Sequence, residues 1–539
     1  MSRMSYVMGG GRKKTVVLTI GLALIMSLTG CRVNSGTDVD VHSEPEFKAK
    51  AVSGKPVVVI IIDSLMNKPL QEALEQDRVP ALKYLIDHGR YYPRIISSFP
   101  TMSVTIDSTL LTGVYADRHH VPGLVWYSDR ERRMIFYGNG PKEALKIDQL
   151  QVLTDSVYQM NQVQLSKKVK TIHEELAESG KHSASINAVI FRGKKERDLR
   201  VPKSMANTTR LPDHYKITAP ELFSLAAFAH LDPRNANHTA LWEKYGMNDK
   251  FTARDIAFLV KNGKLPEVTI GYFPGNDSVH HRKGSMATKG IERADRALRD
   301  VLDAYGSWEE AVKTTTWIIL GDSAQSDVLE NREEFKVDLR PLLNGYRIAK
   351  LDRPVGQDDQ IVIAANERMA YIYAISPGLK LSGIVKGLQT EAKLDIIAVK
   401  RDHSVALTGG GKGENVLSYR PGGPYSDEYG QKWSLSGDPG LADISLRGHR
   451  IKYGQYPDVL ARLYGALHSH EGQYIVVTVK PGYELAGESS PTHRGGGAHG
   501  SLHEVDSVVP LIVTGTDLQP KSPRIVDLKD WILRIAGDR

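Results

Sequence analysis

The sequence predicts an α/β fold in which a mostly parallel central sheet is covered by helices on both faces. Residues 57–62 read Val-Val-Val-Ile-Ile-Ile, and a continuous apolar run of this kind is typical of a parallel strand buried on both sides. Strand-like and helix-like segments then alternate along most of the chain, as they do where crossover helices link parallel strands. The hydrophobic content of 41% is enough for a large core.

The expected elements follow this alternation in order. Strands are predicted at residues 57–63, 94–98, 182–190, 268–273, 315–320, 361–365, 369–375, 394–399, 473–479 and 507–514. Helices are predicted at residues 80–88, 104–111, 165–180, 291–305 and 457–468, and shorter helical pieces at 221–230 and 252–261. We interpret residues 55–539 as a single domain with insertions near 195–265 and 409–456, and we expect these insertions to carry specificity.

Composition narrows the class of protein. Charged residues make up 25% of the chain, and the net charge of +7 is spread along it without a basic block interleaved with aromatic residues. We therefore expect no specific nucleic-acid binding. Cys31 is the only cysteine, which excludes intramolecular disulfides.

The N-terminus has the features of an export signal. Arg3 and the basic run at 12–14 precede an apolar stretch at residues 15–28, which is shorter than the roughly 20 residues that a spanning helix needs. Leu-Thr-Gly-Cys at 28–31 resembles a bacterial lipobox, which implies cleavage of residues 1–30 and lipidation of Cys31. The alternative is an ordinary signal peptide. Residues 31–54 are polar and are interpreted as a tether. This predicts a lipid-anchored protein on the extracytoplasmic face of a bacterial cell membrane.

A cluster of hydroxyl groups marks the first candidate site. Residues 97–113 place Thr101, Ser103 and Thr105 around the predicted start of a helix, directly after Phe-Pro. Free N–H groups and the positive end of the helix dipole favour an anion there. This arrangement suits a nucleophile that attacks a phosphoryl group. Thr101, Ser103 and Thr105 are the candidates, and a plain helix cap at Ser103 is the alternative.

Potential metal ligands follow several predicted strands. They are Asp63, Asp277 with His281, Asp322, and His499 in a glycine-rich loop; His493 and His503 are alternatives to His499. The carboxyl ends of parallel strands meet at one edge of a sheet, so these side chains are expected to converge. Carboxylates with imidazoles suit zinc, and two ions roughly 4 Å apart would clamp the attacking and leaving oxygens of a phosphoryl transfer.

Together these residues resemble the type I phosphodiesterase and nucleotide pyrophosphatase branch of the alkaline phosphatase superfamily. The resemblance spans residues 57–124, 268–326 and 493–514, and rests on Phe-Pro-Thr-x-Ser, Thr-Gly-x-Tyr-x-x-x-His, Asp-x-x-x-His, Gly-Asp and a late His-Gly. It implies an alkaline-phosphatase-like core with inserted cap regions. It also implies a phosphodiesterase that hydrolyses a phosphate-ester small molecule or surface polymer through a covalent phosphoserine, with Ser103 at the position of the family's nucleophile.

The resemblance further implies two divalent metal ions, zinc by first choice. Asp63, Ser103 and Asp322 would hold the nucleophile-side ion, and a second set would hold the other: Asp277, His281 and His499. The family has histidine after the Gly-Asp acid, where this chain has Ser323, so Mn²⁺, Mg²⁺, His280 or water are considered on that side.

A second departure concerns the substrate. Nucleotide-cleaving relatives have asparagine at the position of Leu124, which weakens the expectation of nucleotide cleavage. Other enzyme classes fit less well, because the chain has no Gly-x-Ser-x-Gly elbow at Ser103, no sulfatase motif and no phosphate-binding P-loop. The remaining alternatives are a phosphomonoesterase and a surface lipoprotein that binds a ligand without catalysis.

Overall fold

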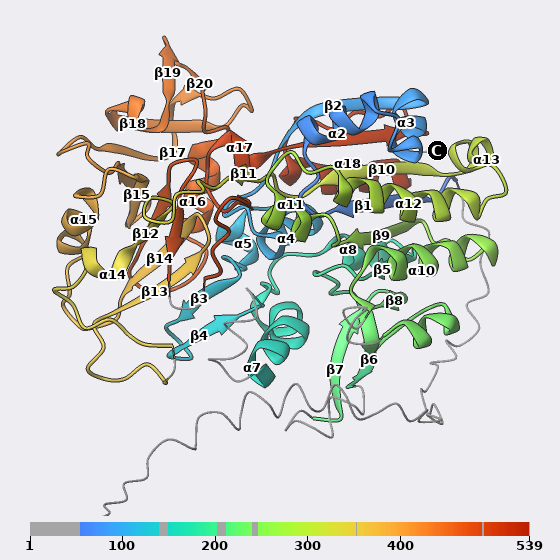
Figure 1. Cartoon of the computed structure of the whole chain (residues 1–539), viewed down its shortest axis with the longest axis horizontal. Helices are drawn as coiled ribbons and strands as arrows, with labels where there is room; N and C mark the ends of the chain where they lie inside the picture. Colours follow the sequence, from blue (N-terminus) through green and yellow to red (C-terminus); the bar gives the residue numbers. More distant parts are fainter. Residues whose placement is uncertain are drawn as a thin grey trace, which may run out of the picture. The chain divides into compact units, whose positions relative to one another are not determined.

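The computed structural model describes residues 54–138, 149–201, 212–239, 246–351, 353–487 and 490–537 (Figure 1). The predicted signal peptide at 1–30, Cys31, and the tether up to residue 53 lie outside the described residues. In the ranges that the structure describes, none of the helices combines the length and the apolar character needed to cross a membrane.

A seven-stranded sheet forms the core. Its order is β2 (Gly89–Ile96), β24 (Val508–Thr514), β10 (Thr316–Gly321), β1 (Val57–Ile62), β9 (Val268–Phe273), β5 (Ser183–Ile186) and β8 (Leu222–Ser224). The five strands from β10 to β8 are parallel, and β24 is antiparallel to both of its neighbours. The predicted mostly parallel sheet is confirmed.

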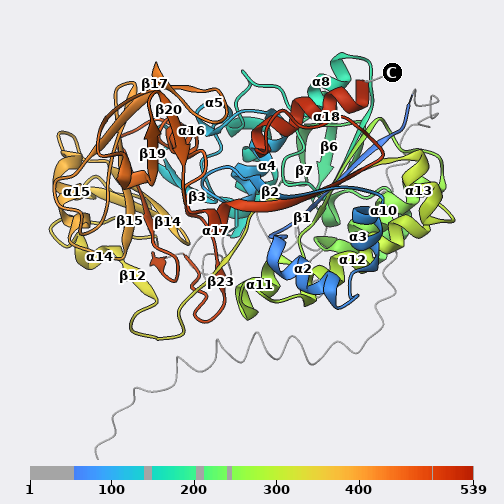
Figure 2. The same ribbon diagram turned by 90° about the horizontal axis from the view of Figure 1, so that it is seen from above.

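The two faces of β1 belong to different hydrophobic cores. Val58, Ile60 and Ile62 pack in a core with α2 (Asn67–Glu75), α3 (Pro80–Asp87), α10 (Asp249–Lys261) and α12 (Lys289–Asp303). Val57, Val59 and Ile61 pack in the other with α4 (Ser103–Thr112), α8 (Ile172–Glu178) and α18 (Leu528–Gly537), and Figure 2 shows these helix groups on opposite sides of the sheet. Burial on both sides explains why every residue of β1 is apolar.

Register brings the ends of the three central strands level. Ile62 lies opposite Gly321 of β10 and Phe273 of β9. The residues that follow these strands therefore emerge at one edge, and this edge carries the candidate site.

A second, nine-stranded sheet was not predicted from the sequence. Its strands are mostly antiparallel: β13 (Ile361–Asn366), β14 (Met369–Ala374), β21 (Tyr474–Val479), β15 (Leu394–Arg401), β16 (Ser404–Thr408), β17 (Leu417–Ser426), β18 (Lys432–Gly437), β19 (Ile444–Arg447) and β20 (Arg450–Tyr453). Residues 409–456, interpreted as an insertion, supply β17 to β20. The helix α16 (Val459–Leu467) contacts β21 and also α5 (Ala116–His119).

Residues 195–265 contain strands as well as helix. A hairpin of β6 (Lys195–Arg200) and β7 (His214–Ala219) precedes β8, and α10 lies against α12 and β9. The helix predicted at residues 221–230 is wrong: β8 and one 3-10 turn (Ala226–Phe228) occupy this segment. Pairing of Leu222 with Ala184 at the sheet edge outweighs the helical tendency of the local sequence.

Apart from a π-helical segment (Asp155–Gln164) and three further 3-10 turns, the remaining helices and strands are short. They are β3 (Val125–Ser128), β4 (Arg133–Phe136), α7 (Gln149–Thr154), α11 (Asp277–Lys283), α13 (Trp308–Thr314), β11 (Ser326–Asp327), β12 (Lys336–Asp338), α14 (Leu339–Leu342), α15 (Leu381–Gln389), β22 (Glu484–Ala486), β23 (Gly497–Ala498) and α17 (Glu504–Ser507). The two-residue pair β11–β23 matters for the site, because it joins the loop after β10 to the glycine-rich loop before His499.

Candidate active site

Three acidic residues meet at the level edge of the central sheet. Asp63 follows β1, Asp322 follows β10, and Asp277 begins α11 shortly after β9. Asn276 holds this arrangement, because its side-chain amide donates to the main-chain oxygens of Asp63 and Ser64 at 2.9 Å each. The sequence-based expectation that these carboxylates converge agrees with their positions in the structure.

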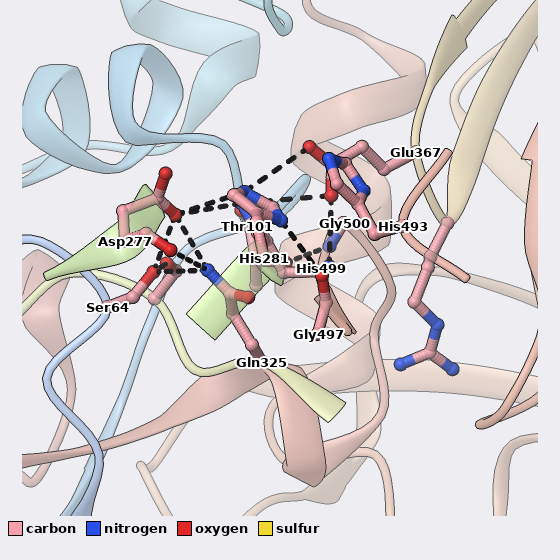
Figure 3. Close-up of polar contacts among 12 residues, drawn as sticks. Ser64, Thr101, Asp277, His281, Gln325, Glu367, His493, Gly497, His499 and Gly500 are labelled. Carbon is pink, nitrogen blue, oxygen red and sulfur yellow. Dashed lines mark hydrogen bonds and ion pairs between the residues drawn. The ribbon is translucent and has the colours of Figure 1, made fainter. Parts of the chain in front are cut away.

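Asp277, His281 and His499 form a compact group, called here the Asp277 centre (Figure 3). Their three potential ligand atoms lie within 4.8 Å of one another. The Asp277 Oδ1 atom is 3.2 Å from His281 Nε2, one helical turn further along α11, and 3.7 Å from His499 Nε2. Two imidazole nitrogens and a carboxylate oxygen are a donor set that fits zinc.

Main-chain carbonyls orient both histidines. The Nδ1 atom of His281 is 2.8 Å from the carbonyl oxygen of Gly497, and Nδ1 of His499 bonds the carbonyl oxygen of Thr101. A carbonyl can only accept, so each Nδ1 carries the hydrogen and each Nε2 faces Asp277. Support of this kind is usual behind histidines that bind metals.

The glycine-rich loop permits a close approach to α11. A Cβ on Gly496 would lie 2.0 Å from the carbonyl oxygen of His281. Gly500 has a φ of 120°, and a Cβ there would lie 2.7 Å from the carbonyl oxygen of Asn366. These positions require glycine, and they allow His499 to reach the centre.

Glu367 is a site residue that the sequence analysis missed. It lies in the turn between β13 and β14, is 4% exposed, and has a φ of 54°, which is unusual for a residue other than glycine. Its carboxylate is 3.7 Å from His281 Nε2 and 3.9 Å from His499 Nε2. His493, considered earlier as an alternative to His499, stacks on His281 with ring centres 4.0 Å apart and forms a second group with His281 and Glu367. No sequence motif marks Glu367.

The charges of the Asp277 centre compensate one another. Burial would raise the pKa of Asp277, but His281 and then His499 hold it well below its usual value. Burial would lower the pKa of His281, but the carboxylates of Asp277 and Glu367 raise it to about 10. A protonated His281 therefore balances these acids, and a divalent cation bound at Nε2 would replace its proton.

This pKa predicts how metal binding depends on pH. We expect the affinity of the Asp277 centre for Zn²⁺ to rise about tenfold per pH unit between pH 7 and pH 9, because the metal must displace one proton from His281. Competition with a chelator of known pH dependence measures the slope. A His281→Ala variant should lose both affinity and slope, and a constant wild-type affinity over this range would contradict the expectation.

Ser103 begins α4 on the nucleophile side of the site. No side chain caps the start of this helix, so its first N–H groups remain available to an anion. Ser103 is partly exposed, whereas Thr101 and Thr105 are fully buried. The Thr101 hydroxyl also accepts from Gly500 N at 2.6 Å. Of the three hydroxyl groups, only that of Ser103 belongs to a residue open to a substrate.

Two buried acids, Asp63 and Asp322, follow neighbouring strands on the nucleophile side of the site. Oδ1 of Asp322 accepts from Ser64 N at 2.9 Å and from Ser323 N at 2.6 Å, and Oδ2 of Asp63 accepts from Tyr272 at 2.5 Å. Burial and then Asp322 raise the pKa of Asp63. Burial also raises the pKa of Asp322, partly offset by main-chain hydrogen bonds and by the Ser103 hydroxyl.

The second oxygen of each carboxylate is buried and has no hydrogen-bond partner among the described residues. Leaving such atoms without a partner is costly, and a cation would satisfy both. The residues present therefore fit a divalent ion on the nucleophile side.

Ser323 does not replace the imidazole that the family has at this position. Its hydroxyl lies 3.0 Å from that of Ser64, which in turn donates to Asp277 at 3.0 Å. His280 and His503 belong to neither of the potential metal groups found among the described residues. Asn366 lies beside the segment that contains Leu124. Its buried side-chain amide accepts from Val125 N at 2.9 Å and donates to Val125 O at 2.8 Å, so both of its polar atoms are already hydrogen-bonded to the main chain.

Comparisons with known proteins agree with this geometry. A model of the type I phosphodiesterase / nucleotide pyrophosphatase family matches residues 57–379, more than half of the chain. No curated protein sequence matches it.

Solved structures of human and murine ectonucleotide pyrophosphatase / phosphodiesterase 5 are similar, with TM-scores of 0.52 and 0.50. Each is 12% identical over 90% of this chain and 95% of that chain, and one murine structure is an inactive variant in complex with AMP. These similarities establish the alkaline-phosphatase-like fold. The chain belongs to the type I phosphodiesterase / nucleotide pyrophosphatase family and is a phosphoric ester hydrolase.

Proposed function

We propose that this protein is a metal-dependent phosphodiesterase that acts through a covalent phosphoserine at Ser103. The observation that carries the proposal is the position of Ser103, partly exposed at an uncapped helix start and beside the buried carboxylate of Asp322. Asn276 links the two sides of the site: it precedes Asp277 in the chain, and its side-chain amide donates to the main-chain oxygen of Asp63. A nucleophile, an anion-binding helix start and two donor sets thus lie together.

The residues divide the reaction between them. Ser103 Oγ attacks phosphorus, and an O–P bond forms as the bond to one alcohol breaks and that alcohol leaves. The first N–H groups of α4 stabilise negative charge on the phosphoryl oxygens. Two divalent ions, one held by Asp63, Ser103 and Asp322 and the other by Asp277, His281 and His499, would supply Lewis-acid stabilisation of the developing negative charge. Water then cleaves the phosphoserine, which releases the phosphomonoester and restores the hydroxyl.

The substrate is proposed only as a class. A small phosphate ester or an anionic surface polymer with phosphodiester links fits the chemistry. The murine neighbour was solved with AMP, but here Leu124 stands where nucleotide-cleaving relatives have asparagine, and the nearby Asn366 is engaged with Val125. We therefore do not extend the proposal to a nucleotide.

Hydrolysis of bis-p-nitrophenyl phosphate tests the proposal. We expect turnover of this diester to exceed that of p-nitrophenyl phosphate, to disappear after chelation, and to return with Zn²⁺ or Mn²⁺. Acid quenching during turnover of the diester should trap a p-nitrophenylphosphoryl group on Ser103, which peptide mass spectrometry detects. Faster turnover of the monoester would instead favour a phosphomonoesterase, and tight metal binding without any turnover would favour a ligand-binding role.

We also propose a lipid-anchored location at the extracytoplasmic face of a bacterial membrane, based on the lipobox-like residues 28–31. Replacing Cys31 by serine is expected to move the protein from the membrane fraction to the soluble fraction of expressing cells. Incorporation of radiolabelled palmitate should be lost as well. Equal membrane association and labelling of the variant would contradict the anchor.

A further inference from the structure

A pocket lined by basic side chains lies beside the Asp277 centre, and neither the family resemblance nor the mechanism above uses it. It is called here the α12 pocket. Its volume is about 490 Å³, within the range of about 300–1,000 Å³ that is typical of sites for small ligands. It is bounded by the start of α10, by α11 with the loop before it, and by one face of α12, which contacts both other helices (Figure 1).

The helix α11 contributes to both sites. Asp277 and His281, four residues apart, lie on the face that forms the Asp277 centre. Ser278 and Arg282 each come one residue later and line the α12 pocket. Successive residues of a helix point about 100° apart, so the pocket lies on the adjacent face of α11. A ligand that extends from the Asp277 centre around this short helix therefore meets the pocket.

Positive charge dominates the α12 pocket. Among the described residues, the acids that line it are Asp249 and Asp300, and Asp249 is buried and accepts from Gly275 N at 2.7 Å. The four arginines of the pocket have no hydrogen bond or ion pair with any described residue. The basic residues that line it are all exposed: Lys250, Arg282, Arg293, Arg296 and Arg299.

Two acids of α12 that could neutralise these arginines have other partners. Glu292 pairs with Arg78 at 2.9 Å. Asp295 is buried and accepts from Leu82 N of α3 at 2.8 Å. Like charges gathered around one hollow repel one another, and an anion that binds there removes this repulsion.

The guanidinium groups indicate which anion fits. Arginine forms paired hydrogen bonds with phosphate oxygens, so several exposed arginines around one pocket suit a phosphate group. The proposed reaction already places one phosphate at Ser103. A second phosphate in the same molecule would account for a phosphate pocket next to the Asp277 centre. A small diester lacks this second group, whereas a polymer with phosphodiester links repeats it.

We propose that the α12 pocket binds a second phosphate group of the substrate, and that the substrate is an anionic polymer with repeated phosphodiester links. The inference rests on the proposed function for the position of the reacting phosphate, and it selects the polymer over the small phosphate ester. The pocket acts in binding alone, because the phosphate held there is not the one that Ser103 attacks.

Oligomers of propanediol phosphate test the inference, because they have repeated phosphodiester links without a base or a sugar. In Arg293→Gln/Arg296→Gln we expect the KM for the oligomer to rise at least about tenfold, with kcat within about twofold of wild type. The ratio of kcat/KM for the oligomer to that for bis-p-nitrophenyl phosphate should fall by the same factor. Anion-exchange chromatography of the fragments measures turnover of the oligomer.

A matched pair of substitutions controls for net charge. Arg447 and Arg450 are exposed arginines of β19 and β20 in the second sheet, and neither lines the α12 pocket. Arg447→Gln/Arg450→Gln removes the same charge as the first pair. It should leave the KM for the oligomer within about twofold of wild type, because the effect of the pocket arginines depends on direct contact with phosphate.

Binding to Ser103→Ala gives a readout that does not depend on turnover. Isothermal titration with the oligomer should show an affinity at least about tenfold lower when Arg293→Gln and Arg296→Gln are added to this variant. Sodium chloride should weaken oligomer binding more steeply in Ser103→Ala than in the variant without the two arginines, because salt screens the charges that they contribute.

The inference is overturned if the double variant of the pocket binds and cleaves the oligomer as the wild type does, or if the control pair has the same effect. Lost binding to phosphatidylglycerol vesicles, with oligomer binding unchanged, would assign this face to a membrane surface and also overturn it.

The two proposals can fail separately. If bis-p-nitrophenyl phosphate is hydrolysed while the pocket variant handles the oligomer as the wild type does, this inference fails and the proposed function stands. If no diester is hydrolysed but the pocket substitutions weaken oligomer binding, the proposed function fails and the phosphate pocket stands.

Discussion

Ser103→Ala is expected to lower the turnover of bis-p-nitrophenyl phosphate by at least about a thousandfold, because neither neighbouring hydroxyl is exposed to take the place of the nucleophile. Thr101 and Thr105 are both fully buried, and the Thr101 hydroxyl is engaged with Gly500 N. The fold should be unaffected, since the Ser103 side chain does not cap α4. Zn²⁺ bound at the Asp277 centre should also remain, and its stoichiometry in the purified variant measures this.

Two neighbouring changes make the result specific to Ser103. Ser108→Ala removes a hydroxyl from the same helix, one that donates to the main-chain oxygen of Val104 at 2.7 Å, and should leave turnover within a few-fold of wild type. Thr105→Val keeps the side-chain shape and removes the alternative nucleophile. If Ser103→Ala is fully active, Ser103 is not the nucleophile. If Thr105→Val loses turnover by about a thousandfold, Thr105 becomes the better candidate.

Every strand of the central sheet except β8 was predictable, because each is a short apolar run that stands out from the sequence around it. Residues 268–273 were expected as a strand and form β9 with the same bounds. The second sheet could not be predicted as a sheet, although β13, β14, β15 and β21 were each expected as strands. Its assembly depends on pairs such as Tyr371 with Val476, which are far apart in sequence, and apolar patterns do not reveal which strands pair.

The residues of the candidate site also differ in whether the sequence could predict them. Asp63, Asp277 and Asp322 could be placed together because topology brings the ends of parallel strands to one edge. Glu367 could not, because it enters from a turn of the second sheet whose position only the folded structure fixes.

Asp277→Asn is expected to reduce the affinity of the Asp277 centre for Zn²⁺ by at least about a hundredfold and to abolish diester turnover. The Asp277 carboxylate contacts every other member of the centre, His281 and His499. It also accepts hydrogen bonds from Gln325 at 2.7 Å and from Ser64 at 3.0 Å. The asparagine amide carries no negative charge to attract a cation. Its NH₂ group would also face the Gln325 and Ser64 groups that donate to Asp277 in the wild type. Isothermal titration with Zn²⁺ and the diester assay measure the two losses.

A third readout separates loss of charge from loss of fold. Asp277 is the strongest contributor that raises the pKa of His281, so in Asp277→Asn this pKa should fall well below about 10, which proton resonances of the imidazole report. Asp327→Asn provides the matched change, since Asp327 holds Ser285 N at 2.6 Å outside the centre and should leave both zinc affinity and the His281 titration unchanged. Retained zinc affinity in Asp277→Asn, with His281 still titrating near its wild-type pKa, would show that the ion is bound elsewhere.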